Sequence, residues 1–77
     1  MNIKILGTGC AKCHKLYKMI DEIIESEKID ATVEKVQDMK EIMGFGVMAT
    51  PGLVIDDEVI FSGSLPSKKQ LIKMIVQ

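Results

Sequence analysis

Both cysteines of the chain lie three residues apart, and its only histidine follows them directly. Residues 7–14 read GTGCAKCH, with Cys10, Cys13 and His14 at the end of the stretch. Three chemistries use this pattern. It is the attachment signature of c-type haem, with the histidine as axial ligand; two thiolates can hold a soft metal ion; and two thiols one helical turn apart can form a reversible disulfide. The neighbouring elements must decide between them.

A short apolar run precedes the motif, and a helical pattern follows it. Residues 2–6 predict a buried strand, and the glycine-rich residues 7–9 predict a loop. From position 11 to about 27, apolar residues recur at the spacing of an amphipathic helix, at Leu16, Met19, Ile20, Ile23 and Ile24. Cys13 falls on the same inward face of this helix, whereas Cys10 lies at its N-terminus.

The rest of the chain predicts three more strands and two more helices. Strands are expected at 31–36, 53–55 and 59–61, the last two joined as a hairpin. Capping boxes, Asp38-x-x-Glu41 and Ser67-x-x-Gln70, precede the two helices. The order β-α-β-α-β-β-α predicts an α/β fold in which a four-stranded mixed sheet is flanked by three helices, in one domain over residues 1–77.

Composition excludes several classes of function. The chain has 77 residues, 27% of them charged, and a formal net charge of −1, so it offers no basic surface for nucleic acid. The first apolar run is shorter than the roughly 7–15 residues of a signal peptide, and no run approaches the ~20 residues of a membrane span. We therefore expect a cytosolic monomer, where two neighbouring cysteines are typical of a catalytic or metal-binding pair.

Two motifs together resemble the thioredoxin/glutaredoxin superfamily, above all its small prokaryotic redox-active disulfide proteins. Cys10-Ala11-Lys12-Cys13 follows the first strand, and FGVMATP at 45–51 resembles the Tyr-Gly-Val-x-x-Thr-Pro run of thioredoxins. The resemblance spans essentially the whole chain and implies a thioredoxin-like fold. It also implies a cis peptide bond before Pro51 and a role for Thr50 and Pro51 in binding an extended substrate strand. Ala11-Lys12 departs from the pairs usual in either parent family.

The chemistry of such a site assigns different roles to the two thiols. Only a thiolate attacks a disulfide, and the positive end of a helix dipole beside the Lys12 ammonium favours a thiolate at Cys10. Cys13, one turn further on, is then the resolving thiol. We expect a thiol-disulfide oxidoreductase that reduces protein disulfides, draws electrons from a separate thiol reductase, and needs no bound cofactor or metal.

A Cu(I)-binding or chaperone module that uses the same two cysteines is the alternative hypothesis. Such modules have a similar length and a Cys-x-x-Cys after the first strand, but their order is β-α-β-β-α-β. Haem attachment requires export and a mostly helical shell, and a closed zinc site requires four ligands. We interpret His14 as an exposed helix residue, Met48 as an apolar contact for partners, and four methionines as core filling: Met19, Met39, Met43 and Met74.

Overall fold

Seven elements follow one another in the predicted order. The computed structural model describes residues 1–9 and 11–76. The elements are β1 (Asn2–Leu6), α1 (Ala11–Ser26), β2 (Thr32–Val36), α2 (Met39–Gly44), β3 (Gly52–Ile55), β4 (Glu58–Ser62) and α3 (Lys68–Val76). Among the described residues, no helix has both the length and the apolar character needed to cross a membrane.

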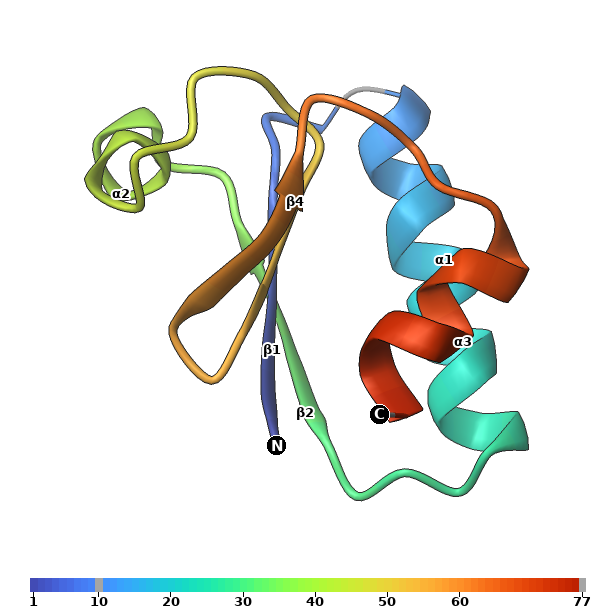
Figure 1. The fold of residues 1–77 in the computed structure, drawn as a ribbon. Coiled ribbons are helices and arrows are strands. Elements are labelled where there is room, and N and C mark those ends of the chain that lie inside the picture. The colour runs from blue at the N-terminus through green and yellow to red at the C-terminus, as the bar shows by residue number, and fades with distance from the viewer. Residues whose placement is uncertain (10, 77) are drawn as a thin grey trace.

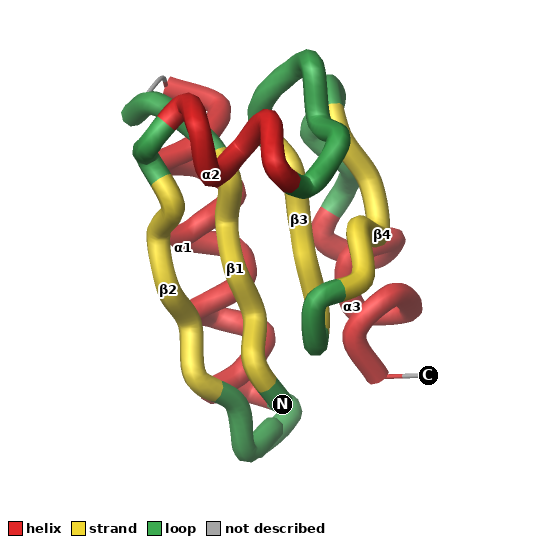
Figure 2. Tube along the Cα trace, turned by 90° about the vertical axis from the view of Figure 1, so that its left-hand side faces the viewer, coloured by secondary structure: helices red, strands yellow, loops and turns green. Residues whose placement is uncertain are grey.

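The four strands form one mixed sheet in the order β2-β1-β3-β4. β1 is parallel to β2 and antiparallel to β3, which is in turn antiparallel to β4. Helices α1 and α3 cover one face of this sheet (Figure 1). Helix α2 crosses the other face, near the end of the sheet at which β1 terminates (Figure 2). The predicted α/β architecture, a four-stranded mixed sheet with three helices, is therefore confirmed.

The core is divided between the two faces because side chains alternate along each strand. One buried cluster lies between the sheet and the helices α1 and α3, and contains Ile3, Ile5, Leu16, Ile20, Ile23, Leu53, Leu71 and Ile75. A smaller cluster lies toward α2 and contains Leu6, Val36, Ile42, Val47 and Val54. Neighbouring residues such as Leu53 and Val54 thus face opposite clusters, which explains the nearly continuous apolar run of the central strand β3.

Side chains cap the two later helices. Ser67 and Gln70 form the predicted reciprocal box: the Gln70 amide donates to Ser67 Oγ at 3.2 Å, and the Ser67 amide donates to Gln70 Oε1 at 3.1 Å. At α2 the predicted box takes another form. Asp38 Oδ1 accepts from the amide of Lys40 at 2.9 Å, which is the second residue of the helix, whereas a capping box uses the third.

The predicted β3–β4 hairpin turns through two aspartates. Asp56 and Asp57 have φ of +49° and +67°, the left-handed conformation that both central residues of a type I′ turn require. Asp56 Oδ1 also accepts a hydrogen bond from the Asn2 amide at 2.8 Å. Aspartate tolerates this backbone conformation better than most residues, so the turn forms without the usual glycine.

The methionines do not all fill the core. Met19 and Met74 are half-buried against the larger cluster, as predicted. The prediction is wrong for Met39 and Met43, which are 56% and 66% exposed. Helix α2 is only six residues long and buries Ile42 alone, so its two methionines lie outside the contact with the sheet.

Candidate functional site

The register of the sheet brings the two sequence motifs to one edge. Leu6, the last residue of β1, is opposite Val36 at the end of β2 and opposite Gly52 at the start of β3. The loop that leads from β1 into α1 therefore lies beside the loop that leads into β3. The first loop precedes Cys13, and the second contains Thr50 and Pro51.

Cys13 is buried at the start of α1, with 6% of its surface exposed, on the inward face that the helical spacing predicts. A Cβ atom built at Gly7 would overlap Cys13 Sγ and would lie 3.0 Å from Cys13 Cβ. The Gly7 amide donates to the Val36 carbonyl at 3.0 Å, which fixes the loop against β2. Only a residue without a side chain lets the thiol approach the loop this closely.

Cys10, the expected nucleophile, lies outside the described residues. Helix α1 begins at the following residue, Ala11, and its first turn contains no acidic side chain. Lys12 and His14 are both exposed on this turn. The exposed ammonium of Lys12 thus lies at the same end of α1 as the positive end of the helix dipole.

Thr50 and Pro51 lie next to the same loop as Cys13. Their peptide bond is cis, and the Pro51 side chain is fully buried. The Pro51 carbonyl accepts from the Gly63 amide at 2.9 Å, which ties this loop to the end of β4. The Cβ atom built at Gly7 would be 4.0 Å from Thr50 Cβ, so Thr50 and Cys13 approach the same point from two sides.

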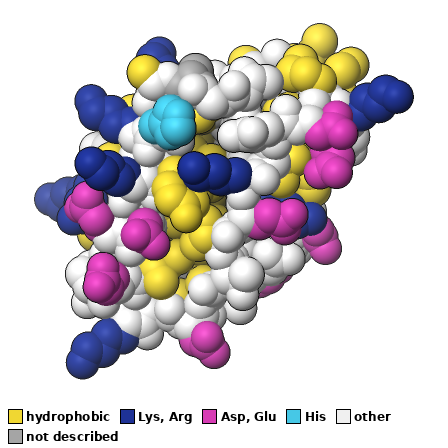
Figure 3. Space-filling model, turned by 180° about the vertical axis from the view of Figure 1, so that it is seen from behind, with side chains coloured by type: hydrophobic (Ala, Val, Ile, Leu, Met, Phe, Trp, Pro, Cys, Tyr) yellow, Lys and Arg dark blue, Asp and Glu magenta, His cyan; other side chains and the backbone are white. Residues whose placement is uncertain are grey.

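A small cavity adjoins the buried thiol. Its volume is about 10 Å³, the space of roughly one water molecule. It is lined by Ile5, Gly7, Gly9, Cys13, His14, Lys35 and Gln37. His14 is exposed, as expected, yet it borders this cavity, and the histidine lies among lysines on the surface in Figure 3. Cys13 therefore forms part of the wall of a space that is large enough for about one water molecule.

Sequence reasoning missed Gly7 and Lys35 as parts of the site. Lys35 Nζ lies 4.3 Å from the centre of the Tyr17 ring, a cation–π contact that holds the lysine beside the cavity. Lys35 is opposite Ile5 in the parallel pair of β1 and β2. If the ends of the two predicted strands had been paired in parallel, Lys35 would have been placed opposite Ile5, close to the cysteine motif.

A larger, apolar groove begins at Thr50 and extends over α2. It has a volume of about 490 Å³ and is lined by Thr8, Met39, Ile42, Met43, Gly46, Val47, Met48 and Thr50. Met48 is fully exposed at its rim. The methionine that the sequence suggested as a contact for partners thus lies on a groove that adjoins the Cys13 loop.

The described residues also bear on metal binding. Within residues 1–9 and 11–76, no group of three or more histidine, cysteine, aspartate or glutamate side chains lies close enough to hold a metal ion. The polar groups of the site are instead a buried thiol, a neighbouring backbone loop, and the exposed Lys12 and His14 on the first turn of α1.

The fold and the buried cysteine beside a cis-proline loop define a thioredoxin-like protein. The family model of the thioredoxin domain matches residues 1–76, so the chain belongs to this family. The thioredoxin of Methanothermobacter thermautotrophicus is 40% identical over 75 residues, which are 97% of either chain. The thioredoxin of Methanocaldococcus jannaschii is 41% identical over 69 residues, which cover 90% of this chain and 79% of that protein.

Proposed function

We propose that this chain is a thiol-disulfide oxidoreductase that reduces protein disulfides with Cys10 and Cys13. One observation carries the proposal: Cys13, at the start of α1, and Thr50, in the cis-proline loop, both lie within 4.0 Å of the place where a Gly7 side chain would stand. Membership of the thioredoxin domain family and relatives named thioredoxin support the same activity.

The proposed reaction passes two electrons to the substrate. The Cys10 thiolate attacks one sulfur of the substrate disulfide, so a mixed disulfide forms and the other substrate sulfur leaves as a thiolate that takes up a proton. Cys13 then loses its proton and attacks the Cys10 sulfur. The second substrate thiol departs, and a Cys10–Cys13 disulfide closes. A separate thiol reductase returns the pair to the dithiol, and no bound cofactor takes part.

The surrounding residues have supporting roles in this proposal. The α1 dipole and Lys12 stabilise the Cys10 thiolate. Thr50 and Pro51 hold an extended stretch of substrate against the dithiol through the backbone of Thr50. The protein acts as a monomer. It works in a reducing, cytosolic compartment, because the cysteine pair stays reduced there and the reduced pair is the form that attacks disulfides.

The Cu(I)-chaperone alternative is not favoured. Its expected order of elements ends in a strand, whereas α3 follows the last strand here, and the family match is to the thioredoxin domain. Tight, stoichiometric Cu(I) binding by a protein that turns over no disulfide would reverse this preference.

Two single-cysteine variants test the mechanism. The pre-reduced protein is mixed with insulin, and loss of the insulin disulfides is followed in a single turnover. Cys10→Ser should abolish the reaction, whereas Cys13→Ser should accumulate a mixed disulfide that a reducing agent releases. A Cys10→Ser variant with wild-type activity would rule out the proposed nucleophile. Thioredoxin reductase and glutathione, supplied separately, then identify the source of electrons.

A further inference from the structure

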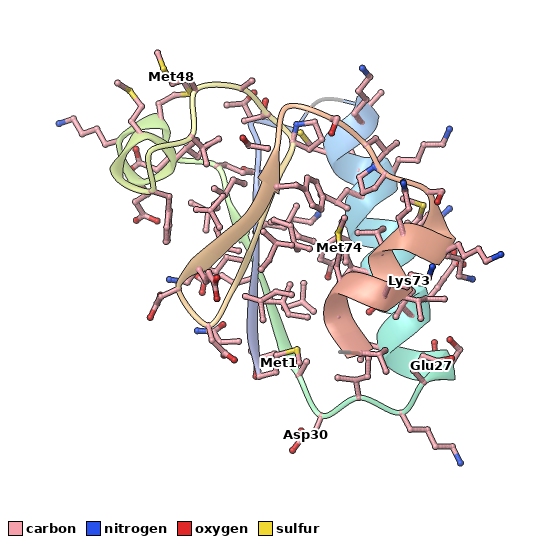
Figure 4. The ribbon with its side chains drawn as sticks, in the orientation of Figure 1. Met1, Glu27, Asp30, Met48, Lys73 and Met74 are labelled. Carbon is pink, nitrogen blue, oxygen red and sulfur yellow. The ribbon has the colours of Figure 1, made fainter. Side chains whose placement is uncertain are left out.

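Three methionines border the apolar groove over α2 from the outside. Met39, Met43 and Met48 are 56%, 66% and 100% exposed. Figure 4 shows Met48 projecting outward from the loop between α2 and β3. Apolar side chains at such exposure contribute little to burial on folding. A cluster of them at the rim of a groove is typical of a surface that contacts another molecule.

The groove adjoins the loop against which Cys13 packs, because Thr8 lines the groove and its neighbours Gly7 and Gly9 line the cavity beside Cys13. Thr50 lines the groove, and the same residue approaches Cys13 beside Gly7. A polypeptide bound at Thr50 therefore has the groove as its next contact in the direction of α2. None of the described lining residues is charged, and a volume of about 490 Å³ accommodates several side chains. These features fit an extended stretch with aliphatic residues beside its disulfide.

Thioethers give this surface a chemistry that leucine would not have. Hydrogen peroxide transfers one oxygen atom to a methionine sulfur, which yields the sulfoxide and water. The sulfur loses two electrons, and the O–O bond of the peroxide breaks. The product is polar, so it weakens apolar contacts at the same position. Met19 and Met74 are half-buried against the larger core cluster and are therefore less accessible to peroxide.

We propose that Met39, Met43 and Met48 form a peroxide-modifiable docking surface for aliphatic segments that flank the disulfide of a protein substrate. This inference rests on the proposed function, because the groove acts only on substrates that reach the dithiol. Sulfoxide formation at these positions lowers the affinity for aliphatic substrates, and it leaves the reaction with small disulfides unchanged.

The first experiment locates the modification. The protein is treated with hydrogen peroxide in its Cys10–Cys13 disulfide form, which protects both sulfurs, and oxidised methionines are identified by peptide mapping over time. Met39, Met43 and Met48 should oxidise roughly tenfold faster than Met19 and Met74, because peroxide reaches exposed thioethers more readily. Equal rates at all five positions would overturn the proposal.

The second experiment measures the consequence. The treated protein is reduced with dithiothreitol, shown to carry two thiols per chain, and mixed in single turnovers with two synthetic peptide disulfides. One peptide carries leucine and valine beside its cystine, the other serine and glycine. The untreated protein should react about four- to fifteenfold faster with the aliphatic peptide, a ratio that matches the burial of one or two methylene groups. Peroxide treatment should remove most of this preference.

Variants separate the methionine groove from other effects of peroxide. In a Met39→Leu, Met43→Leu, Met48→Leu variant, peroxide should not change the ratio of the two peptide rates. In Met74→Leu it should change the ratio as in the wild-type protein. A preference that survives sulfoxidation, or a treated protein that loses both peptide reactions equally, contradicts the inference. Failure of the untreated protein to reduce either peptide would instead contradict the proposed function.

Discussion

Gly7 and Cys13 are in closer contact than any side chain at position 7 would allow. The sulfur of Cys13 occupies the place where a Cβ atom of residue 7 would stand. This contact joins the β1–α1 loop to the first turn of the helix, and Thr50 approaches the same point from the cis-proline loop. The thiol therefore packs against the backbone of the β1–α1 loop, and the side chain of Thr50 lies close to the same loop.

Replacement of Gly7 by alanine should displace the Cys13 side chain. Because the added methyl group overlaps the sulfur, the reduced protein should lose about 1–3 kcal/mol of its free energy of unfolding, as overpacked cores do. Urea denaturation measures this loss. The step in which Cys13 resolves the mixed disulfide should slow as well.

Gly44→Ala is the matched control for this substitution. A Cβ atom built at Gly44 meets no atom within 4 Å, and the residue is the last of α2. Alanine there should be neutral or should stabilise the protein by up to about 1 kcal/mol, since it favours the helix over glycine. If the two variants had the same free energy of unfolding, steric overlap at Gly7 would not be the cause.

Local patterns were sufficient to predict every element of the fold. The helical spacing placed Cys13 on the inward face of α1, and the Ser67-x-x-Gln70 motif placed the start of α3. Both predictions depend on residues within one or two turns of each other. The order of the elements then restricts the sheet to few arrangements, because a β-α-β unit requires a parallel pair of strands.

Local sequence patterns could not predict the contacts between segments that are far apart in the sequence. Gly7 is part of a glycine-rich turn in the sequence, and its close approach to Cys13 arises only when α1 lies on the sheet. Lys35 reaches the cavity because of the register between β1 and β2. The exposure of Met39 and Met43 depends on how little of the sheet a six-residue helix covers. The three-dimensional packing sets each of these features.

Ser67→Ala should destabilise the protein without a change in its chemistry. The hydroxyl of Ser67 accepts from the Gln70 amide at the start of α3, and loss of such a cap costs about 1 kcal/mol. Urea denaturation should show this decrease, while the single-turnover rate with insulin stays that of the wild-type protein. Ser64→Ala, which alters an exposed loop serine, serves as the control. An equal loss in both variants would argue against the cap.

Asp57→Gly should stabilise the β3–β4 hairpin. Asp57 has φ of +67°, a conformation that glycine adopts without the cost that an L-residue pays. Its ion pair with Lys4 is 3.9 Å long and the carboxylate is 82% exposed, so little is lost with it. We expect a gain of about 0.5 kcal/mol in the free energy of unfolding.

Asp56→Ala should have the opposite effect on the same turn. Alanine keeps the unfavourable positive φ and removes the hydrogen bond from the Asn2 amide, so the free energy of unfolding should fall by about 1 kcal/mol. Thermal unfolding of Asp57→Gly and Asp56→Ala measures both changes in stability. The reverse order of stability, with Asp56→Ala above Asp57→Gly, would contradict this account of the turn.

Lys12→Glu should reduce the reactivity of Cys10. The ammonium of Lys12 lies on the first turn of α1, where it adds to the positive end of the helix dipole, whereas a carboxylate opposes it. At pH 7 the rate of Cys10 alkylation by iodoacetamide should fall about two- to fivefold, because the fraction of thiolate falls. In 1 M salt the difference should shrink, since Lys12 is exposed and its charge is screened. Lys18→Glu makes the same change in net charge further along α1, so equal slowing in both variants would assign the effect to net charge and exclude a local role of Lys12.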